Sequence, residues 1–368
     1  MVNVAVVQCT EYDPEKVLRA VRRSIDLLGG MDRFVKSGQK VFIKPNLLSA
    51  RKPEEGVDTH PSVVRAVVKL VKEAGAKAMI GDSPGGFIDN EYIDKVFEVS
   101  GMKALAKEER VDCARLTESV SVKGYPISKL ILESDLIISV PKFKTHDLMT
   151  LTLGVKNLYG AVTGPHKVHL HLGAPKPEDF ANIVVDIFEI AKPALTILDG
   201  IVAMEGGGPA AGPLKKMGCI ASSADAVALD AVISSMVGLK PLDVPSTKAA
   251  FERGLGEADI NKIKVVGDGL KEFSGKNFKL PTVQLLKRAP RALSKILVSL
   301  VKFYPDIGQQ LCKKCGMCEK SCPAKAISVK NKQYVIDRSL CIKCFCCREV
   351  CRYNAIDLKK NIFAKMLF

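Results

Sequence analysis

Eight of the twelve cysteines of this 368-residue chain lie in two short runs that share one spacing. The runs are Cys312-x2-Cys315-x2-Cys318-x3-Cys322-Pro323 and Cys341-x2-Cys344-x2-Cys347-x3-Cys351. A shift of Leu311–Ile327 by 29 residues onto Leu340–Ile356 matches eight of 17 positions, so the segment is an internal duplication. This spacing is typical of a small fold built around iron–sulfur clusters. Three thiolates on one loop hold three corners of a cubane, and the fourth comes from the other repeat.

Charge divides the chain into two unlike parts. Residues 281–368 hold 18 Lys and Arg against five acidic residues, which accounts for +13 of the formal charge of +15. The N-terminus lacks the regions of a signal peptide, and no apolar run reaches the roughly 18–20 residues of a membrane-spanning helix. We therefore expect a cytoplasmic protein whose cysteines serve metal or redox chemistry rather than disulfides.

Residues 1–280 alternate short apolar runs with amphipathic stretches, which is typical of a mainly parallel sheet covered on both faces. Strands are expected at Asn3–Gln8, Lys40–Lys44, Lys77–Ile80, Asp135–Val140, Ala194–Leu198, Gly218–Ser222 and Lys262–Val266. Helices are expected at Pro14–Leu28, Pro61–Ala74, Ile93–Ala106, Pro177–Ala191 and Ala224–Val237. The predicted fold is a large, mainly parallel-sheet α/β domain followed by a small C-terminal α+β domain.

Several of the predicted strands run directly into polar residues at their carboxyl ends. In open α/β sheets ligands bind at this edge, so we expect these side chains to share one cleft. The candidate catalytic residues are Lys44, Asp82, Lys142, Lys144, His146 and Lys156. Crowded lysines favour an anionic small-molecule substrate with a carboxylate or phosphate group. The alternative is that the Gly, Pro, Asp and Asn residues here only form turns.

A histidine-rich stretch at residues 166–171 allows two interpretations. On an extended strand His169 and His171 would point the same way, as a metal pair requires. The stretch lacks the spacing of a zinc site, however, and a solvated loop without chemistry explains it as well. Its role stays open.

A basic segment at residues 281–305 joins the two domains, and residues 359–368 form a basic tail. The apolar residues after Pro290 follow a helical stripe. Such a linker helix can dock on the large domain, which we favour, or make peripheral contact with an anionic membrane surface.

The basic charge of the C-terminal part also bears on its binding partners. Nucleic-acid binding has only this charge in its favour. Surface lysines of the cysteine-rich domain would instead steer an acidic redox partner protein. Nothing indicates the oligomeric state.

The cysteine-rich domain, residues 306–358, resembles the bacterial two-cluster ferredoxins. The resemblance implies two [4Fe–4S] clusters, with Cys312, Cys315, Cys318 and Cys351 on one and Cys341, Cys344, Cys347 and Cys322 on the other. Zinc held by Cys-x2-Cys pairs would leave half of each run without a role. Two residues depart from the ferredoxin pattern. Arg352 replaces the usual proline, and Cys346 is a ninth cysteine, which we interpret as a buried thiol rather than a ligand.

The large domain carries a series of motifs in a fixed order. They are Lys44-Pro45-Asn46-Leu47, Thr59-His60-Pro61, Gly81-Asp82-Ser83-Pro84-Gly85-Gly86, Lys142-Phe143-Lys144-Thr145-His146 and Gly154-Val155-Lys156-Asn157-Leu158-Tyr159-Gly160. With these motifs the chain resembles the domain-of-unknown-function family 362 over nearly all of residues 1–358. The resemblance implies a cytoplasmic iron–sulfur protein of anaerobic-type metabolism, with the large domain as its substrate or partner site.

Three functions are compatible with these observations. The first is an oxidoreductase that delivers single electrons from the two clusters to a substrate or partner at the α/β cleft. The second is a non-catalytic ferredoxin-type electron carrier that docks on a partner enzyme, and the third is a metal-cofactor assembly or maturation factor. We favour the first, because the cluster domain is fused to a domain with a polar cleft. The absence of a nucleotide or flavin motif keeps the second open.

Overall fold

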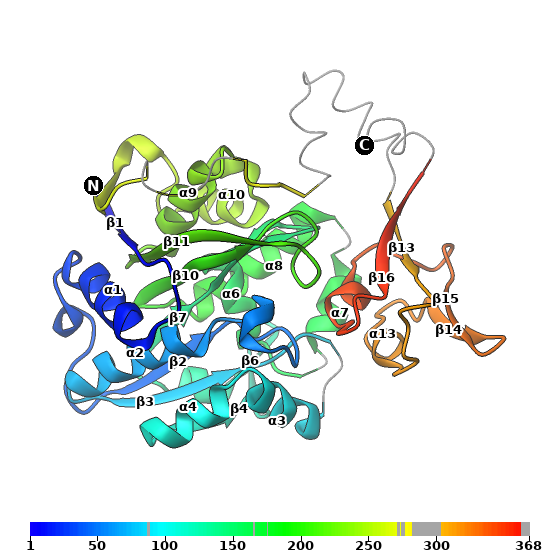
Figure 1. Cartoon of the computed structure of the whole chain (residues 1–368), viewed down its shortest axis with the longest axis horizontal. Coiled ribbons are helices and arrows are strands. Elements are labelled where there is room, and N and C mark those ends of the chain that lie inside the picture. Colours follow the sequence, from blue (N-terminus) through cyan, green and yellow to red (C-terminus); the bar gives the residue numbers. More distant parts are fainter. Residues whose placement is uncertain are drawn as a thin grey trace.

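The computed structural model describes residues 1–86, 89–164, 166–174, 176–270, 273, 277–281 and 303–361. Two bodies of unequal size lie side by side (Figure 1). The larger is an α/β domain with a ten-stranded sheet, and the smaller is a module made from the cysteine-rich segment. The linker helix expected at residues 281–305 lies outside the described residues except at its two ends.

Eight strands form the main path of the sheet, in the order β12-β1-β11-β10-β7-β2-β3-β4. Their bounds are β1 Val2–Gln8, β2 Lys40–Pro45, β3 Lys77–Asp82, β4 Asp112–Arg115, β7 Leu136–Val140, β10 Leu195–Met204, β11 Leu214–Ser223 and β12 Ile263–Gly267. Neighbours are parallel except at β11, which is antiparallel to both β1 and β10. The prediction of a mainly parallel sheet is confirmed.

Two further strands extend the sheet beyond the end of β7. Strand β8 (Lys142–His146) pairs in parallel with β10, and β9 (Thr150–Thr152) returns antiparallel to β8. A separate antiparallel pair, β5 (Ser119–Val122) and β6 (Tyr125–Ser128), precedes the short helix α5 (Lys129–Leu132).

Helices cover both faces of the sheet and enclose two hydrophobic cores. One face carries α1 (Pro14–Asp26), α2 (Pro61–Glu73), α3 (Asn90–Val99) and α4 (Met102–Glu109). The other carries α6 (Gly154–Asn157), α8 (Pro177–Ile190), α9 (Ala226–Met236) and α10 (Pro245–Glu252). Asp13 and Asp225 cap α1 and α9 by accepting backbone N–H groups of the first turn. Burial on both faces explains the continuous apolar runs of the central strands.

Some expected elements differ in the structure. The strands expected at Ala194–Leu198 and Gly218–Ser222 extend to ten residues each, as β10 and β11. The helix expected at Ile93–Ala106 is split into α3 and α4, because Gly101 has a φ of +80° that an α-helix does not accommodate. The histidine-rich stretch forms the helix α7 (His166–Gly173), not an extended segment. Residues two apart on a helix lie on different faces, and accordingly His169 is exposed while His171 is buried. This arrangement rules out the metal pair that an extended strand would allow.

The C-terminal module contains two antiparallel strand pairs and two short helices. Strand β13 (Phe303–Ile307) pairs with β16 (Ile356–Lys360), and β14 (Ile327–Lys330) pairs with β15 (Gln333–Ile336). The helices are α13 (Met317–Lys320) and α14 (Cys346–Glu349). Because its first and last strands pair with each other, the module starts inside the expected linker and ends inside the expected tail. Among the residues that the structure describes, no helix is long and apolar enough to cross a membrane.

Candidate functional site

The eight cysteines of the two runs surround two separate cavities in the C-terminal module. Cys312, Cys315, Cys318 and Cys351 line one cavity, and Cys322, Cys341, Cys344 and Cys347 line the other. Each has a volume of about 20 Å³. Backbone N–H groups of Ala326 and Ala355 donate to Sγ of Cys322 and Cys351 at 3.2 and 3.3 Å, and such bonds stabilise negatively charged sulfur. Four sulfur donors around a cavity, with amide support, fit an iron–sulfur cluster.

The module is held against the α/β domain by buried polar contacts. Arg348 of α14 forms an ion pair with Asp147, which lies in the turn between β8 and β9. Arg51 donates to the carbonyl oxygen of Cys351 at 3.0 Å and to Asn354 Oδ1 at 2.9 Å. These contacts place α14 over the carboxyl edge of the sheet.

A cavity of about 70 Å³ lies between this sheet edge and α14. Its lining comes from the ends of β2 and β3 with the loops that follow, from the part of the chain that runs from β9 into α7, and from α14. The expected convergence of strand ends at one edge is therefore seen for β2 and β3.

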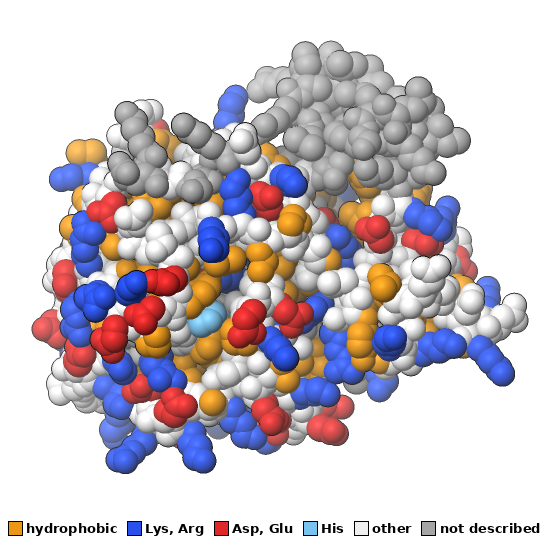
Figure 2. All heavy atoms as spheres, viewed as in Figure 1, with side chains coloured by type: hydrophobic (Ala, Val, Ile, Leu, Met, Phe, Trp, Pro, Cys, Tyr) orange, Lys and Arg blue, Asp and Glu red, His pale blue; other side chains and the backbone are white. Residues whose placement is uncertain are grey.

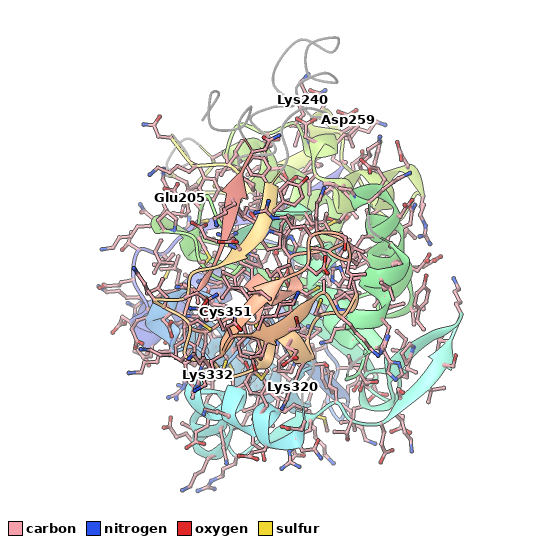
Figure 3. All side chains as sticks on the ribbon, turned by 90° about the vertical axis from the view of Figure 1, so that its right-hand side faces the viewer. Glu205, Lys240, Asp259, Lys320, Lys332 and Cys351 are labelled. Atoms are coloured by element: carbon pink, nitrogen blue, oxygen red, sulfur yellow. The ribbon has the colours of Figure 1, made fainter. Side chains whose placement is uncertain are left out.

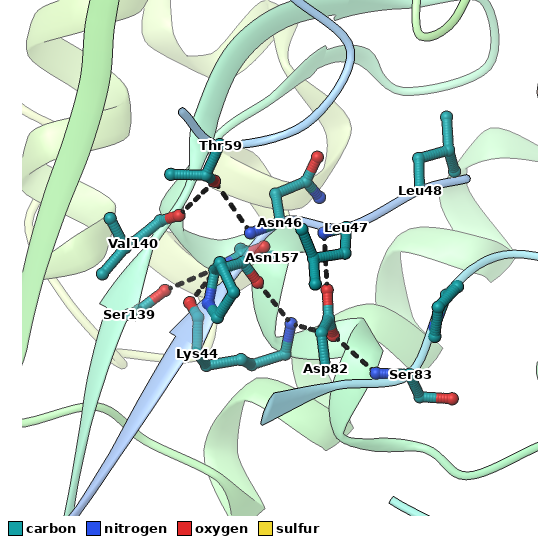
Figure 4. A network of polar contacts seen from close by, with 12 residues as sticks. Lys44, Asn46, Leu47, Leu48, Thr59, Asp82, Ser83, Ser139, Val140 and Asn157 are labelled. Carbon is teal, nitrogen blue, oxygen red and sulfur yellow. Dashed lines mark hydrogen bonds and ion pairs between the residues drawn. The ribbon is translucent and has the colours of Figure 1, made fainter. Parts of the chain in front are cut away.

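Lys44 and Asp82 form a buried ion pair in the lining of this cavity (Figure 4). Lys44 Nζ lies 2.6 Å from Asp82 Oδ1. The carboxylate also accepts the backbone N–H groups of Leu47 and Ser83, at 2.7 and 2.8 Å. Burial lowers the pKa of Lys44, and the charge of Asp82 opposes that shift. A Cβ at Gly160 would collide with both members of the pair, so glycine is needed here.

Helix α7 contributes two more buried side chains, Lys167 and His171. Lys167 Nζ donates to the carbonyl oxygen of Pro84 at 2.7 Å and to that of Ser83, and burial lowers the pKa of this lysine to about 7. The His171 ring stacks on Phe180 with ring centres 4.0 Å apart. Burial lowers the pKa of His171 to about 3, so the ring is neutral at pH 7.

Lys156 projects from α6, and Asp230 of α9 holds that helix in place. The Asp230 carboxylate accepts the first two backbone N–H groups of α6 at 2.7 and 3.1 Å. The ring centre of Tyr159 is 5.8 Å from Lys156 Nζ, and no described residue forms a hydrogen bond or ion pair with this nitrogen. Burial lowers the pKa of Lys156, while the charge of Glu349 acts to raise it.

Glu349 of α14 brings a carboxylate from the C-terminal module into the cavity, where His146 contacts it. His146 Nδ1 accepts the backbone N–H groups of Leu148 and Met149, both at 3.2 Å, so the proton belongs on Nε2. Nε2 lies 3.1 Å from Glu349 Oε1, although its alignment falls outside hydrogen-bond geometry. Burial lowers the pKa of His146 to about 4. Burial acts to raise the pKa of Glu349, but the contact with His146 and the charge of Lys156 lower it to about 2.

The prediction that all six candidates share one pocket is wrong. Lys142 Nζ lies 2.8 Å from Asp199 Oδ2 and 2.6 Å from Tyr12 Oη, in a separate buried network. Lys144 Nζ donates to the carbonyl oxygen of Val57 at 2.7 Å. The reason is the pairing of β8 with β10, which sets Lys142 opposite Asp199 rather than toward the cleft. Of the six candidates, the cavity lining contains Lys44, Asp82 and Lys156, and His146 reaches it through Glu349.

The lining also contains Lys167, His171 and Glu349, which are not among the candidate catalytic residues predicted from the sequence. The spacing of the histidines alone does not show that their stretch is helical. A helical period would have placed residues 167 and 171 on one face, because they are four apart. No local signal connects Glu349, in the other module, with the sheet edge. Cys346 is buried and lines the cavity between the modules, whereas its neighbour Cys347 lines the cavity of the second cysteine set.

Fold and site together define a class of protein. In this class an α/β domain has a polar site at its sheet edge, and a module with two sets of four cysteines covers that site. Residues 305–328 match the 4Fe-4S binding domain. Residues 41–235 match the domain of unknown function DUF362. The chain belongs to the DUF362 family and carries a 4Fe–4S binding domain, as the resemblance implied.

Similar proteins cover different shares of the chain. The thylakoid-associated protein sll1697 of Synechocystis sp. is 34% identical over 308 residues, which are 82% of this chain and 94% of that protein. The lactate racemase apoprotein from Thermoanaerobacterium thermosaccharolyticum aligns with a TM-score of 0.38 at 15% identity, over 60% of this chain and 54% of that one. A protein from Thermotoga maritima aligns with a TM-score of 0.33 at 15% identity, over 58% of this chain and 56% of that one. The aligned part is thus little more than half of either solved structure.

Proposed function

We propose that the protein is an oxidoreductase that holds two [4Fe–4S] clusters and passes single electrons to a small ligand in the cavity between its modules. Cys312, Cys315, Cys318 and Cys351 would hold one cluster, and Cys341, Cys344, Cys347 and Cys322 the other. Such clusters supply one-electron oxidation and reduction when bound.

Helix α14 is the observation that carries this proposal. Cys347 lines the cavity of the second cysteine set, while Cys346 and Glu349 on the same short helix line the cavity between the modules. A ligand beside Lys44 and Lys156 would therefore lie next to the residues that carry the second cluster. The α/β domain contributes charged groups that bind and orient the ligand, and α14 covers them from water.

The first cysteine set supports an acidic redox protein as the electron donor. Cys315 is exposed, and the neighbouring Lys313 and Lys314 are exposed residues that line the same cavity. Figure 2 shows further basic side chains along the lower surface of the module, and Figure 3 labels Lys320 and Lys332 on it. Opposite charge steers association, so electrons would enter at the first set and leave through the second.

The two alternatives fit the geometry less well. A diffusing carrier would present its cluster loops to a partner, yet the helix that carries Cys347 of the second set is held against the α/β domain through Arg348. Arg51 holds the carbonyl oxygen of Cys351, in the first set, against the same domain. A maturation factor would hold a metal-containing intermediate, yet the cavity is lined by Lys44, Lys156 and Lys167, and an ammonium group has no lone pair to offer a metal. We propose a cytoplasmic location. Because the Synechocystis relative is named for its association with thylakoids, fractionation of cell membranes is the direct test.

Metal analysis and spectroscopy test the proposal. Anaerobically purified protein should carry about eight iron and eight sulfide ions per chain. Cys312→Ser should lose about half of the iron, whereas Cys346→Ser should keep nearly all of it. Stoichiometric zinc without sulfide would contradict the cluster assignment. Paramagnetic resonance of the reduced protein should change when a small anion enters the cavity, and the Cys312→Ser protein should keep this response because the second set is unaltered.

A further inference from the structure

Among the described residues of the cavity between the modules, Lys156 is a lysine with aromatic neighbours, Tyr159 and Phe180, but without a hydrogen-bond or ion-pair partner. Lys44 is paired with Asp82, and Lys167 donates to two backbone carbonyl groups. Lys156 Nζ forms neither kind of contact with the residues that the structure describes. Glu349, whose charge also acts on Lys156, is itself in contact with His146. An anion beside Lys156 would offset the cost of burying its ammonium group.

Several buried polar atoms of the same lining also lack partners. Within the described ranges these atoms are Asn46 Oδ1, Ser83 Oγ, Thr152 Oγ1, Asn157 Oδ1, His171 Nδ1 and Glu349 Oε1. The side-chain nitrogen of Asn157 is already used, because Nδ2 donates to the Lys44 carbonyl oxygen at 3.2 Å and to Ser139 Oγ at 2.9 Å. Its Oδ1 is therefore left as an acceptor. Buried polar groups are normally satisfied, so this concentration around one cavity indicates a ligand that supplies hydrogen-bond donors as well as charge.

The volume of the cavity limits the size of that ligand. Its 70 Å³ compares with roughly 300–1,000 Å³ for the pockets of larger ligands and cofactors. Each water molecule in the liquid occupies roughly 30 Å³. A two- or three-carbon acid is of the right size, and a nucleotide or a flavin is not.

We propose that this cavity binds a small monocarboxylate that carries a hydroxyl or amino group on the carbon next to the carboxylate. The carboxylate pairs with Lys156 Nζ, and the hydroxyl or amino group donates to acceptors such as Asn157 Oδ1 and Thr152 Oγ1. A bare dianion such as phosphate fits less well, because Asp82 and Glu349 line the same space and would repel it. The location of the ligand rests on the proposed function, while its chemical class follows from the lining alone.

Calorimetric titration of the anaerobic, cluster-loaded protein tests the ligand class with three probes: glycolate, acetate and inorganic phosphate. Glycolate should bind about tenfold more tightly than acetate, because only glycolate supplies the extra donor. Phosphate should bind more weakly than either. Lys156→Met should weaken both carboxylates by about tenfold or more. Lys240→Met, at an exposed position on the α/β domain, is the matched control and should change neither.

Thr152→Val is a second test of the ligand class, and this variant should fold as the unaltered protein does. Because Thr152 Oγ1 has no partner within the described chain, valine should leave the melting temperature unchanged or raise it. It should nevertheless reduce the preference for glycolate over acetate. Equal binding of glycolate and acetate by the unaltered protein, or tighter binding of phosphate, would overturn the proposed class.

The outcome that would contradict the proposed function differs from the outcome that would contradict the ligand class. If glycolate binds but leaves the paramagnetic spectrum of the reduced clusters unchanged, the ligand class stands and the electron-transfer role falls. If no carboxylate binds while the spectrum still responds to another small anion, the ligand class falls and the role stands.

Discussion

Replacing Asp82 by asparagine should destabilise the protein in a way that depends on pH. The substitution leaves the buried Lys44 ammonium group without the carboxylate that lies 2.6 Å away. The variant can avoid that charge by releasing the proton of Lys44, which limits the cost. From an ordinary lysine pKa of about 10.4 and about 1.36 kcal/mol per unit, deprotonation at pH 7 costs about 4.6 kcal/mol. We expect a loss of about 3–5 kcal/mol, as for other buried pairs that lose one partner.

The sign of the pH dependence follows from the proton balance. Below pH 10 the unfolded chain keeps Lys44 protonated, while the folded variant keeps it neutral, so folding releases a proton. The penalty should shrink as pH rises and fall to about 2 kcal/mol at pH 9. Lys44→Met is the matched comparison, because Asp82 then keeps two backbone N–H donors. Its cost should be about 1–3 kcal/mol and nearly equal at pH 7 and pH 9.

Thermal unfolding followed by circular dichroism under anaerobic conditions measures both variants against the unaltered protein at the same pH. With about 2 °C per kcal/mol for a chain of this size, Asp82→Asn should lower the melting temperature by about 6–10 °C at pH 7. At pH 9 the difference should be about half as large or less. An equal loss at both values of pH, or a larger loss in Lys44→Met, would refute the argument.

Three further substitutions test other parts of the structure. Gly160→Ala should lower the melting temperature and abolish carboxylate binding, because its Cβ would meet the Lys44–Asp82 pair; Gly173→Ala, with nothing within 4 Å, should be tolerated. Asp147→Asn should leave Arg348 unpaired at the module interface and speed proteolytic release of the C-terminal module, and unchanged digestion would contradict that. Burial raises the pKa of Asp230 from 3.8 to about 8, so its contribution to stability is present below pH 4 and lost as pH rises through 8. The melting temperature of the unaltered protein relative to Asp230→Asn should therefore fall between pH 5 and pH 8, and a constant difference would contradict the shift.

Elements of the α/β domain were predictable because their signals are local. Strands β1, β2 and β7 lie within one or two residues of their expected bounds, since runs of apolar residues and nearby turn residues depend only on neighbours in the chain. The break between α3 and α4 was missed, because a glycine within a periodic helical pattern does not reveal its φ angle. Helix α7 was missed because histidine spacing was given more weight than helical period.

The candidate site likewise contains residues that the sequence places together and pairings that only the tertiary structure shows. Lys44 and Asp82 could be placed together from the sequence, because the carboxyl ends of adjacent parallel strands meet at one edge. The grouping of the cysteines was likewise implied by the resemblance of one duplicated segment to the two-cluster ferredoxins, and the two cavities contain the same sets. Only the tertiary structure decided which charges become partners. It pairs Lys142 with Asp199 away from the cleft and brings Glu349 to His146 from the other module. Such pairings depend on how two separately specified bodies pack, and burial then decides which ionic contacts are strong and which lysine remains available to a ligand.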